Sequence, residues 1–171
     1  DAFSAGITSQ GMDVIRIGLA STDMLYFAAG KLNMPGAMFT ASHNPAQYNG
    51  IKLCLSGARP VGVDTGLAEV KDIAQRILDG LKPVKAERAG RTTERDLLSA
   101  FVDHVVSFID PASIRPMRVV ADTANGMGGL VVPAVFERLP RLELEVMYGE
   151  LDGTFPNHPA DPLQAANQRD L

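Results

Sequence analysis

Short apolar runs alternate along this chain with segments that have the spacing of amphipathic helices. The run from Val14 to Leu19 is rich in β-branched residues and follows Gly11, which predicts a buried strand. A helix capped by Ser21 or Thr22 is expected next. The expected strands are residues 14–19, 37–40, 50–55, 118–121 and 142–148. The expected helices end at residues 10, 32, 78, 109 and 139, and the one that ends at 109 is expected to be capped by Thr93. This alternation favours an α/β fold.

Proline residues and the two chain ends suggest how these elements are grouped. Pro111 and Pro116 bracket a short connector, so we expect one domain over residues 1–115 and a second that starts at 116 and runs to 171. Asp161 followed by Pro162 is typical of a helix start, yet only residues 163–171 remain for that helix. Because both ends fall inside expected helices, we expect the chain to be a fragment.

The composition excludes several classes of protein. Of the 171 residues, 46% are hydrophobic and 21% are charged, which is the balance of a globular protein rather than a disordered chain. The net charge is −4 and no basic block exceeds two residues, so nucleic acid is not an expected partner. No apolar stretch is long enough to span a membrane. The single cysteine, Cys54, favours a reducing cytoplasm and is expected to be an inert core thiol.

The loop between the expected strands 37–40 and 50–55 carries the most unusual group of side chains. It reads Thr-Ala-Ser-His-Asn-Pro over residues 40–45 and Tyr-Asn-Gly-Ile-Lys over 48–52. A serine that carries phosphate can transfer it to a substrate hydroxyl, provided that positive charge and a base are near. His43 and Lys52 are the candidates for those roles. From the residues alone a simple polar turn is the competing interpretation, because Ser, Asn and Pro are common turn formers.

These motifs resemble the phosphoserine loop of the α-D-phosphohexomutases, the family of phosphomannomutase and phosphoglucomutase. The resemblance covers most of the chain. It continues through residues 122–129 (Asp-Thr-Ala-Asn-Gly-Met-Gly-Gly) and 152–158 (Asp-Gly-Thr-Phe-Pro-Asn-His). It implies repeated domains with mixed β-sheets flanked by helices, of which this chain would hold most of the first domain and the opening of the second.

The resemblance also implies a role for each residue of the loop. Ser42 would be the phosphorylated serine, and its phosphate would be a ligand of a bound Mg²⁺. His43 would lie beside the substrate hydroxyl, and Lys52 would assist proton transfer as acid or base. Thr40, Asn44 and Asn49 would shape the loop. The implied reaction converts a hexose 6-phosphate into its 1-phosphate through a bisphosphorylated sugar.

Several parts of the family pattern have no counterpart in this sequence. The family binds magnesium through an Asp-x-Asp-x-Asp loop, and no two aspartates here are separated by a single residue. The family's sugar-recognition and phosphate-binding loops are also missing. We therefore expect the fragment to carry the catalytic serine but to be inactive alone, with the other Mg²⁺ ligands outside it.

Three alternatives stay open. Within the family, the sequence does not separate phosphomannomutase or phosphoglucomutase from phosphoglucosamine mutase, and it leaves the oligomeric state open. A non-catalytic nucleotide-binding domain could use Gly126 and Gly128, although Val131 stands where that fingerprint needs a small residue. A domain that kept the fold and lost activity is the third alternative.

Two further histidines have less specific interpretations. His158 could form a metal site with Asp152 and Asp161, but prolines separate the three residues and favour an extended crossover loop. His104 lies on the edge of an apolar helical face and is expected to be a packed structural residue.

Overall fold

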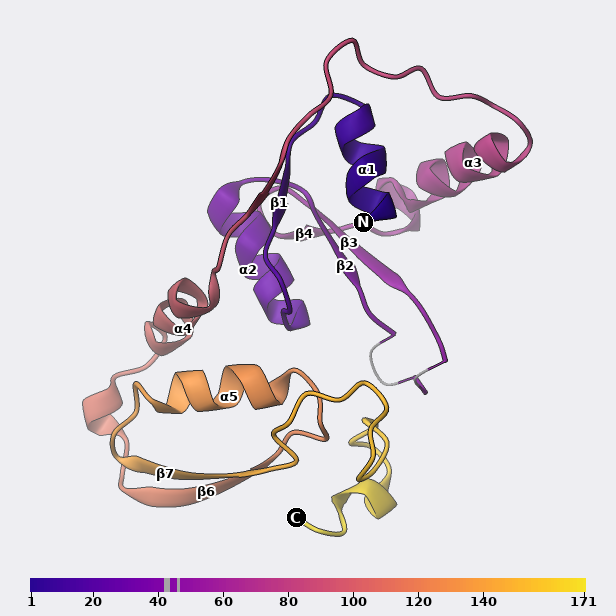
Figure 1. Cartoon of the computed structure of the whole chain (residues 1–171). Helices are drawn as coiled ribbons and strands as arrows, with labels where there is room; N and C mark the ends of the chain where they lie inside the picture. The colour runs from indigo at the N-terminus through magenta and orange to yellow at the C-terminus, as the bar shows by residue number, and fades with distance from the viewer. Residues whose placement is uncertain (42–43, 46) are drawn as a thin grey trace. The chain divides into compact units, whose positions relative to one another are not determined.

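A computed structural model of the protein describes residues 1–41, 44–45 and 47–171 (Figure 1). It contains both parallel and antiparallel β-sheets with helices beside them, which confirms the α/β class. Contacts divide the chain into two units. One contains residues 1–18 and 59–96, and the other contains residues 19–58 and 97–171. No helix in the described part of the chain is long and apolar enough to cross a lipid bilayer.

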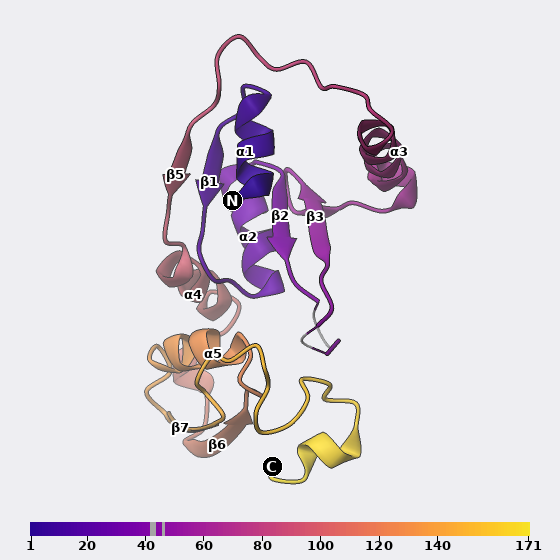
Figure 2. The same ribbon diagram turned by 45° about the vertical axis from the view of Figure 1, so that its right-hand side comes forward.

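The larger unit begins with helix α2 (Thr22–Leu32), which packs beside an antiparallel strand pair (Figure 2). The pair consists of β2 (Gly36–Phe39) and β3 (Ile51–Leu55). The Ser21 hydroxyl accepts a hydrogen bond from the Met24 backbone N–H at 3.3 Å, which confirms the predicted cap. The side chains of Leu25, Ala29 and Cys54 form the buried core between helix and strands.

A strand–helix–strand motif forms the end of this unit. Strand β6 (Met117–Asp122) pairs in parallel with β7 (Leu142–Met147), and α5 (Gly128–Phe136) covers one face of the pair (Figure 1). The helix comes very close to the chain after β7, since a Cβ built on Gly129 would lie 2.0 Å from the Gly149 carbonyl oxygen.

Helix α4 (Leu98–Val106) belongs to the same unit and buries Phe101 and Val102. The rings of Phe27 on α2 and Phe101 meet edge to face at 5.5 Å. The His104 ring contacts the rings of Phe27 and Phe108, at 5.1 and 4.8 Å, yet the residue is exposed, so the expected packing is only partial.

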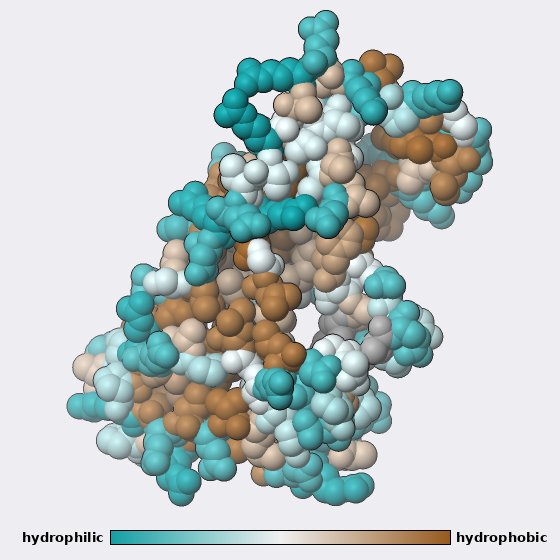
Figure 3. All heavy atoms as spheres, viewed as in Figure 1, coloured by the Kyte–Doolittle hydropathy of each residue, from teal (hydrophilic) through white to brown (hydrophobic). Residues whose placement is uncertain are grey.

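The smaller unit joins residues that are far apart in the sequence. After helix α1 (Ala2–Ser9), strand β1 (Val14–Arg16) pairs in parallel with β5 (Thr92–Glu94). The connecting segment contains the two-residue strand β4 (Arg59–Pro60), a 3-10 turn (Val63–Thr65) and helix α3 (Leu67–Leu78). Large apolar side chains of α3 are exposed to solvent, as the apolar surface over this helix in Figure 3 shows; they are Leu67, Val70, Ile73 and Ile77.

Three expected elements differ from the structure. Thr93 does not cap a helix, because residues 92–94 form β5 and α4 begins only at Leu98 and ends at Val106. The expected helix over 163–171 is a short 3-10 turn, Ala165–Gln168, although Asp161 does accept a hydrogen bond from the Leu163 N–H at 3.0 Å. Strand β1 ends at Arg16 rather than Leu19, since Gly18 adopts a φ of +73° that a strand cannot accommodate.

Candidate functional site

The backbone closes the loop between β2 and β3 on itself. The Thr40 N–H donates to the Gly50 carbonyl at 3.0 Å, and the Tyr48 N–H donates to the Pro45 carbonyl, also at 3.0 Å. A Cβ on Gly50 would lie 2.6 Å from the Thr40 carbonyl oxygen, so this position requires glycine. Both the backbone N–H and the side-chain amide of Asn44 donate to the Ala41 carbonyl, at 3.1 and 2.9 Å.

Strand register places Lys52 at the base of this loop. Lys52 lies directly opposite Met38 across the antiparallel pair, so the two side chains share one face of the sheet. That face packs on α2, because the Thr22 hydroxyl donates to the Met38 sulfur at 3.8 Å. Thr40 follows Met38 by two residues and therefore points to the same side. The half-buried Lys52 and Thr40 are thus neighbours on the helix-covered face.

The remaining predicted loop residues divide into two groups. Asn44 and Asn49 are exposed in the loop. Ser42 and His43, the predicted phosphate carrier and its neighbour, lie outside the described residues. The role of each residue stays a prediction.

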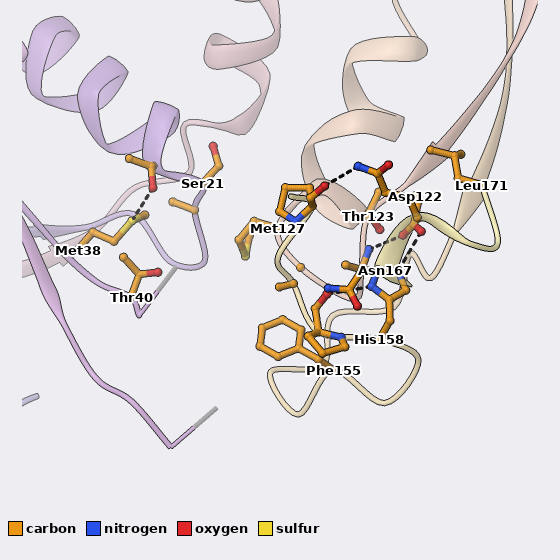
Figure 4. Close-up of a pocket in the computed structure, with 18 residues that line it drawn as sticks. Ser21, Met38, Thr40, Asp122, Thr123, Met127, Phe155, His158, Asn167 and Leu171 are labelled. Atoms are coloured by element: carbon orange, nitrogen blue, oxygen red, sulfur yellow. Dashed lines mark hydrogen bonds and ion pairs between the residues drawn. The ribbon is translucent and has the colours of Figure 1, made fainter. Parts of the chain in front are cut away.

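An open pocket of about 520 Å³ lies within the larger unit. One side is formed by the start of α2 and the end of β2, with Ser21, Met38 and Thr40, as Figure 4 shows. The other side is formed by the turn that follows β6 and by the chain after β7, with Asp122 and His158. The pocket thus lies between the Thr40 end of the loop and the polar pair Asp122 and His158, which the sequence analysis did not bring together.

The turn between β6 and α5 is held by its own side chains. One carboxylate oxygen of Asp122 accepts a hydrogen bond from the Ala124 N–H at 2.9 Å. The Thr123 hydroxyl donates to the Tyr148 carbonyl at 2.9 Å. Ala124 and Asn125 have φ values of +48° and +57°, a left-handed conformation that costs energy in most residues. The segment that leads to Gly126 and Gly128 is therefore a strained turn stabilised by hydrogen bonds.

Asn125 connects this turn to the chain after β7. Its side chain is 5% exposed and donates to the Glu150 carbonyl at 2.9 Å, while its amide oxygen accepts from the Asn157 amide at 2.8 Å. Its backbone N–H donates to the Tyr148 carbonyl at 2.9 Å, and its carbonyl accepts from the Asp152 N–H at 3.0 Å. In the sequence, Asn125 stands out only as a member of the motif over residues 122–129.

His158 forms the second link between the two segments. Its Nε2 atom lies 2.9 Å from the Asp122 carboxylate, and its Nδ1 atom lies 2.9 Å from the Pro159 carbonyl. The Pro159 carbonyl raises the pKa of His158 most, the Asp122 carboxylate raises it further, and burial opposes both. Sequence reasoning considered His158 only with Asp152 and Asp161, and did not pair it with Asp122, which lies 36 residues earlier.

The other members of that candidate metal set have separate partners. Asp152 accepts hydrogen bonds from the Thr154 N–H and hydroxyl, which lower the pKa of this carboxyl group. Asp161 accepts from the Leu163 N–H. Among the described residues, no three His, Cys, Asp or Glu side chains come together in a way that could hold a metal ion. Burial raises the pKa of the Cys54 thiol, which agrees with an unreactive core cysteine.

Comparison with known proteins gives a consistent result along the chain. Residues 1–79 match the phosphoglucomutase/phosphomannomutase alpha/beta/alpha domain I, and residues 99–171 match domain II of the same family. A phosphomannomutase of Escherichia coli is 38% identical over 167 residues, which are 95% of this chain and 36% of that protein. The phosphohexose mutases of Xanthomonas campestris are 38% identical over 170 residues, 98% of this chain and 37% of theirs.

A solved structure shows the same relation in three dimensions. The crystal structure of a phosphoglucomutase/phosphomannomutase family protein from Burkholderia thailandensis superposes with a TM-score of 0.79 at 30% identity, covering 99% of this chain and 36% of that one. The chain therefore spans a little more than a third of the length of these relatives. The matched ranges leave residues 80–98 between them, so the domain boundary expected near residue 115 stays a prediction. Because two consecutive domain types of one family match along its length, this chain belongs to the phosphoglucomutase/phosphomannomutase family.

Proposed function

We propose that the protein containing this chain is a phosphohexomutase that interconverts hexose 6-phosphates and 1-phosphates of mannose or glucose, with Ser42 as phosphate carrier. The observation that carries this proposal is the position of the Ser-His-Asn-Pro segment, which connects β2 and β3 in a chain of this family. The pocket beside Thr40 supports it, since a phosphosugar needs an open site next to the carrier. The name of the similar phosphohexose mutases of Xanthomonas campestris describes the same class of reaction.

The proposed step transfers one phosphoryl group between two oxygen atoms. A sugar hydroxyl attacks the phosphorus of phosphorylated Ser42, a new P–O bond forms, and the bond to the serine oxygen breaks. The hydroxyl proton leaves to a base and the serine oxygen regains a proton, so charge and atoms balance. The reverse transfer from the bisphosphorylated sugar restores the phosphoserine.

Lys52 and His43 are the proposed proton-handling and orienting groups. The position of Lys52 supports its role, because strand register brings it to the face that carries Thr40 at the base of the loop. His43 would lie beside the attacking hydroxyl. Thr40, Asn44 and Asn49 would hold the loop shape, and the two hydrogen bonds from Asn44 to the Ala41 carbonyl are of this kind.

Mg²⁺ is the proposed cofactor, with the phosphate of Ser42 as one ligand. The described residues offer no set of three His, Cys, Asp or Glu side chains to hold it. The other ligands are proposed to lie in the rest of the protein, and this segment alone is proposed to be inactive. A cytoplasmic setting fits the single reduced cysteine.

The experiment uses the full-length protein. The active enzyme is expected to carry about 80 Da of extra mass on the Ser42 peptide, as the carrier role requires. Ser42→Ala is expected to abolish both this mass and turnover, whereas Ser9→Ala on α1 is expected to leave both unchanged. Wild-type turnover in Ser42→Ala would refute the proposal.

The alternatives give different results in the same assay. A panel of mannose, glucose and glucosamine phosphates separates the proposed activity from phosphoglucosamine mutase. Micromolar binding of NAD or ATP by a protein without turnover would instead support the nucleotide-binding interpretation of the Gly126 turn. A protein with neither property would be a domain that has kept the fold without the activity.

A further inference from the structure

The chain after β7 is attached to the turn after β6 by several side-chain contacts. Asn125 bonds to the Glu150 carbonyl and to Asn157, and Asp122 bonds to His158. The Tyr148 hydroxyl, at the end of β7, donates to the Asp170 carboxylate at 2.7 Å. Figure 4 shows the His158 and Asp122 side chains directed toward one another in the pocket wall. Of these contacts, the His158 contact is the one whose charge changes near neutral pH.

The surroundings of the His158 ring favour the form with two ring protons. Each of its nitrogens lies 2.9 Å from an acceptor, the Asp122 carboxylate at Nε2 and the Pro159 carbonyl at Nδ1. A neutral imidazole has a single N–H, so one of its nitrogens would then direct a lone pair at an oxygen. Only the imidazolium makes both contacts attractive, and its side chain is 14% exposed, so water screens the charge little.

The groups that face His158 come from every segment packed against it. Asp122 lies at the end of β6, and the Tyr148 ring meets the histidine ring edge to face at 5.5 Å. The Asp170 carboxylate, bonded to the Tyr148 hydroxyl, adds a second negative charge from the C-terminal segment. Both carboxylates favour the protonated ring.

We propose that His158 is a proton-dependent latch: when both ring nitrogens are protonated, it holds residues 150–171 against the turn after β6, and loss of one proton loosens this segment. The segment contributes Phe155, Pro159, Pro162 and Leu171 to the pocket lining, so the latch sets the shape of the pocket wall. The latch is formed by this chain's own residues and does not depend on phosphoryl transfer.

The direction of the pH effect follows from linkage. The folded state raises the pKa of His158 above its ordinary value of about 6.5. The latch therefore contributes its full stability below about pH 6.5, and this contribution is lost as the pH rises through the higher pKa of the folded state.

The test uses the chain as it stands, with two NMR measurements. The His158 ring is expected to titrate above about pH 6.5. Amide hydrogen exchange over residues 150–171, corrected for its intrinsic pH dependence, is expected to show local opening that rises about fivefold between pH 6 and 8.5, as the charge-assisted hydrogen bond is lost.

Asp122→Asn provides a sharper test because it should reverse the pH dependence of the opening of residues 150–171. The new amide oxygen can still accept from the Ala124 N–H, while its NH₂ group can donate to Nε2 of a neutral imidazole. His158 is then expected to titrate below about pH 6.5, and the segment should open on acidification. Asp103→Asn removes an exposed carboxylate that pairs with Arg138 at 3.2 Å and does not act on His158, and is expected to behave as wild type.

Three outcomes would overturn the latch. One is a His158 titration in the wild type at or below the value of an ordinary histidine, and this measurement decides the question even if Asp122→Asn does not fold. The second is the same pH dependence of exchange in the wild type and in Asp122→Asn. The third is an Asp103→Asn variant that reverses the pH dependence as Asp122→Asn does, which would indicate a general charge effect.

Discussion

At the scale of single residues, the buried side-chain amide of Asn125 links the turn after β6 to the chain after β7. Its backbone has a left-handed conformation. Its side chain donates to the Glu150 carbonyl and accepts from the Asn157 amide. Replacing it by alanine leaves the Glu150 carbonyl and the Asn157 amide without this partner. We expect Asn125→Ala to lower the free energy of unfolding by about 2–4 kcal/mol, measured by denaturant titration.

Asn33 provides the matched control for this prediction. It is exposed at the end of α2 and also has a left-handed φ of +50°. Asn33→Ala should therefore cost only the backbone preference, about 1 kcal/mol. Equal losses in the two variants would show that the buried hydrogen bonds of Asn125 contribute nothing.

Lys52 is the residue whose predicted role most needs a kinetic test. In the full-length protein, Lys52→Ala is expected to slow turnover by about 10²–10⁴-fold, the range of acid–base catalysis, while the circular dichroism and melting temperature stay near wild type. Lys71→Ala on the exposed α3 is the control. An unchanged rate would remove Lys52 from the mechanism.

At the scale of elements, the contact between α5 and the chain after β7 depends on glycine. A Cβ on Gly129 would meet the Gly149 carbonyl at 2.0 Å, and backbone atoms cannot rotate away as a side chain can. Gly129→Ala is therefore expected to lower the unfolding free energy by about 3 kcal/mol or to separate helix and strand. Gly153→Ala, with nothing within 4 Å of its Cβ, should change it by less than about 0.5 kcal/mol.

The elements that the sequence predicted well are those with local signals. Helix α2 has a serine cap and an apolar face, and β3 is an apolar run closed by turn residues, so both were located within one or two residues. Strand β5 was missed because Thr92–Glu94 becomes a strand only by pairing with Val14–Arg16, far away in the sequence. No local periodicity reports such a pairing.

The candidate site also contains residues with a local sequence signal and residues that are brought together only by long-range contacts. The loop over residues 40–52 was identified because its polar residues are contiguous, and strand register then brought Lys52 to the face of Thr40. The Asp122–His158 pair was not foreseen, since its members are separated by 36 residues and each has an ordinary local explanation, a strand end and a proline-rich loop. Contacts between polar residues that lie far apart in the sequence can be identified only from the three-dimensional structure.

At the scale of the whole molecule, the chain matches two domain types but spans little more than a third of its relatives. The loop proposed to carry phosphate and the pocket beside Thr40 lie in this chain, whereas the aspartate loop expected to bind magnesium has no counterpart in its sequence. We expect this chain alone to show no mutase turnover when assayed with a hexose 1-phosphate and Mg²⁺. Measurable turnover would contradict the need for the remaining segments.

The parallel pairing of β1 with β5 has a consequence for limited proteolysis. The connection over residues 82–89 is exposed and contains Lys85 and Arg88, after which trypsin cleaves. A nick there would leave two pieces still joined by the β1–β5 pair and by the packing of Phe27 on Phe101. Both pieces should co-elute in gel filtration and separate only in denaturant, so the continuity of the backbone at this point is dispensable for holding the molecule together.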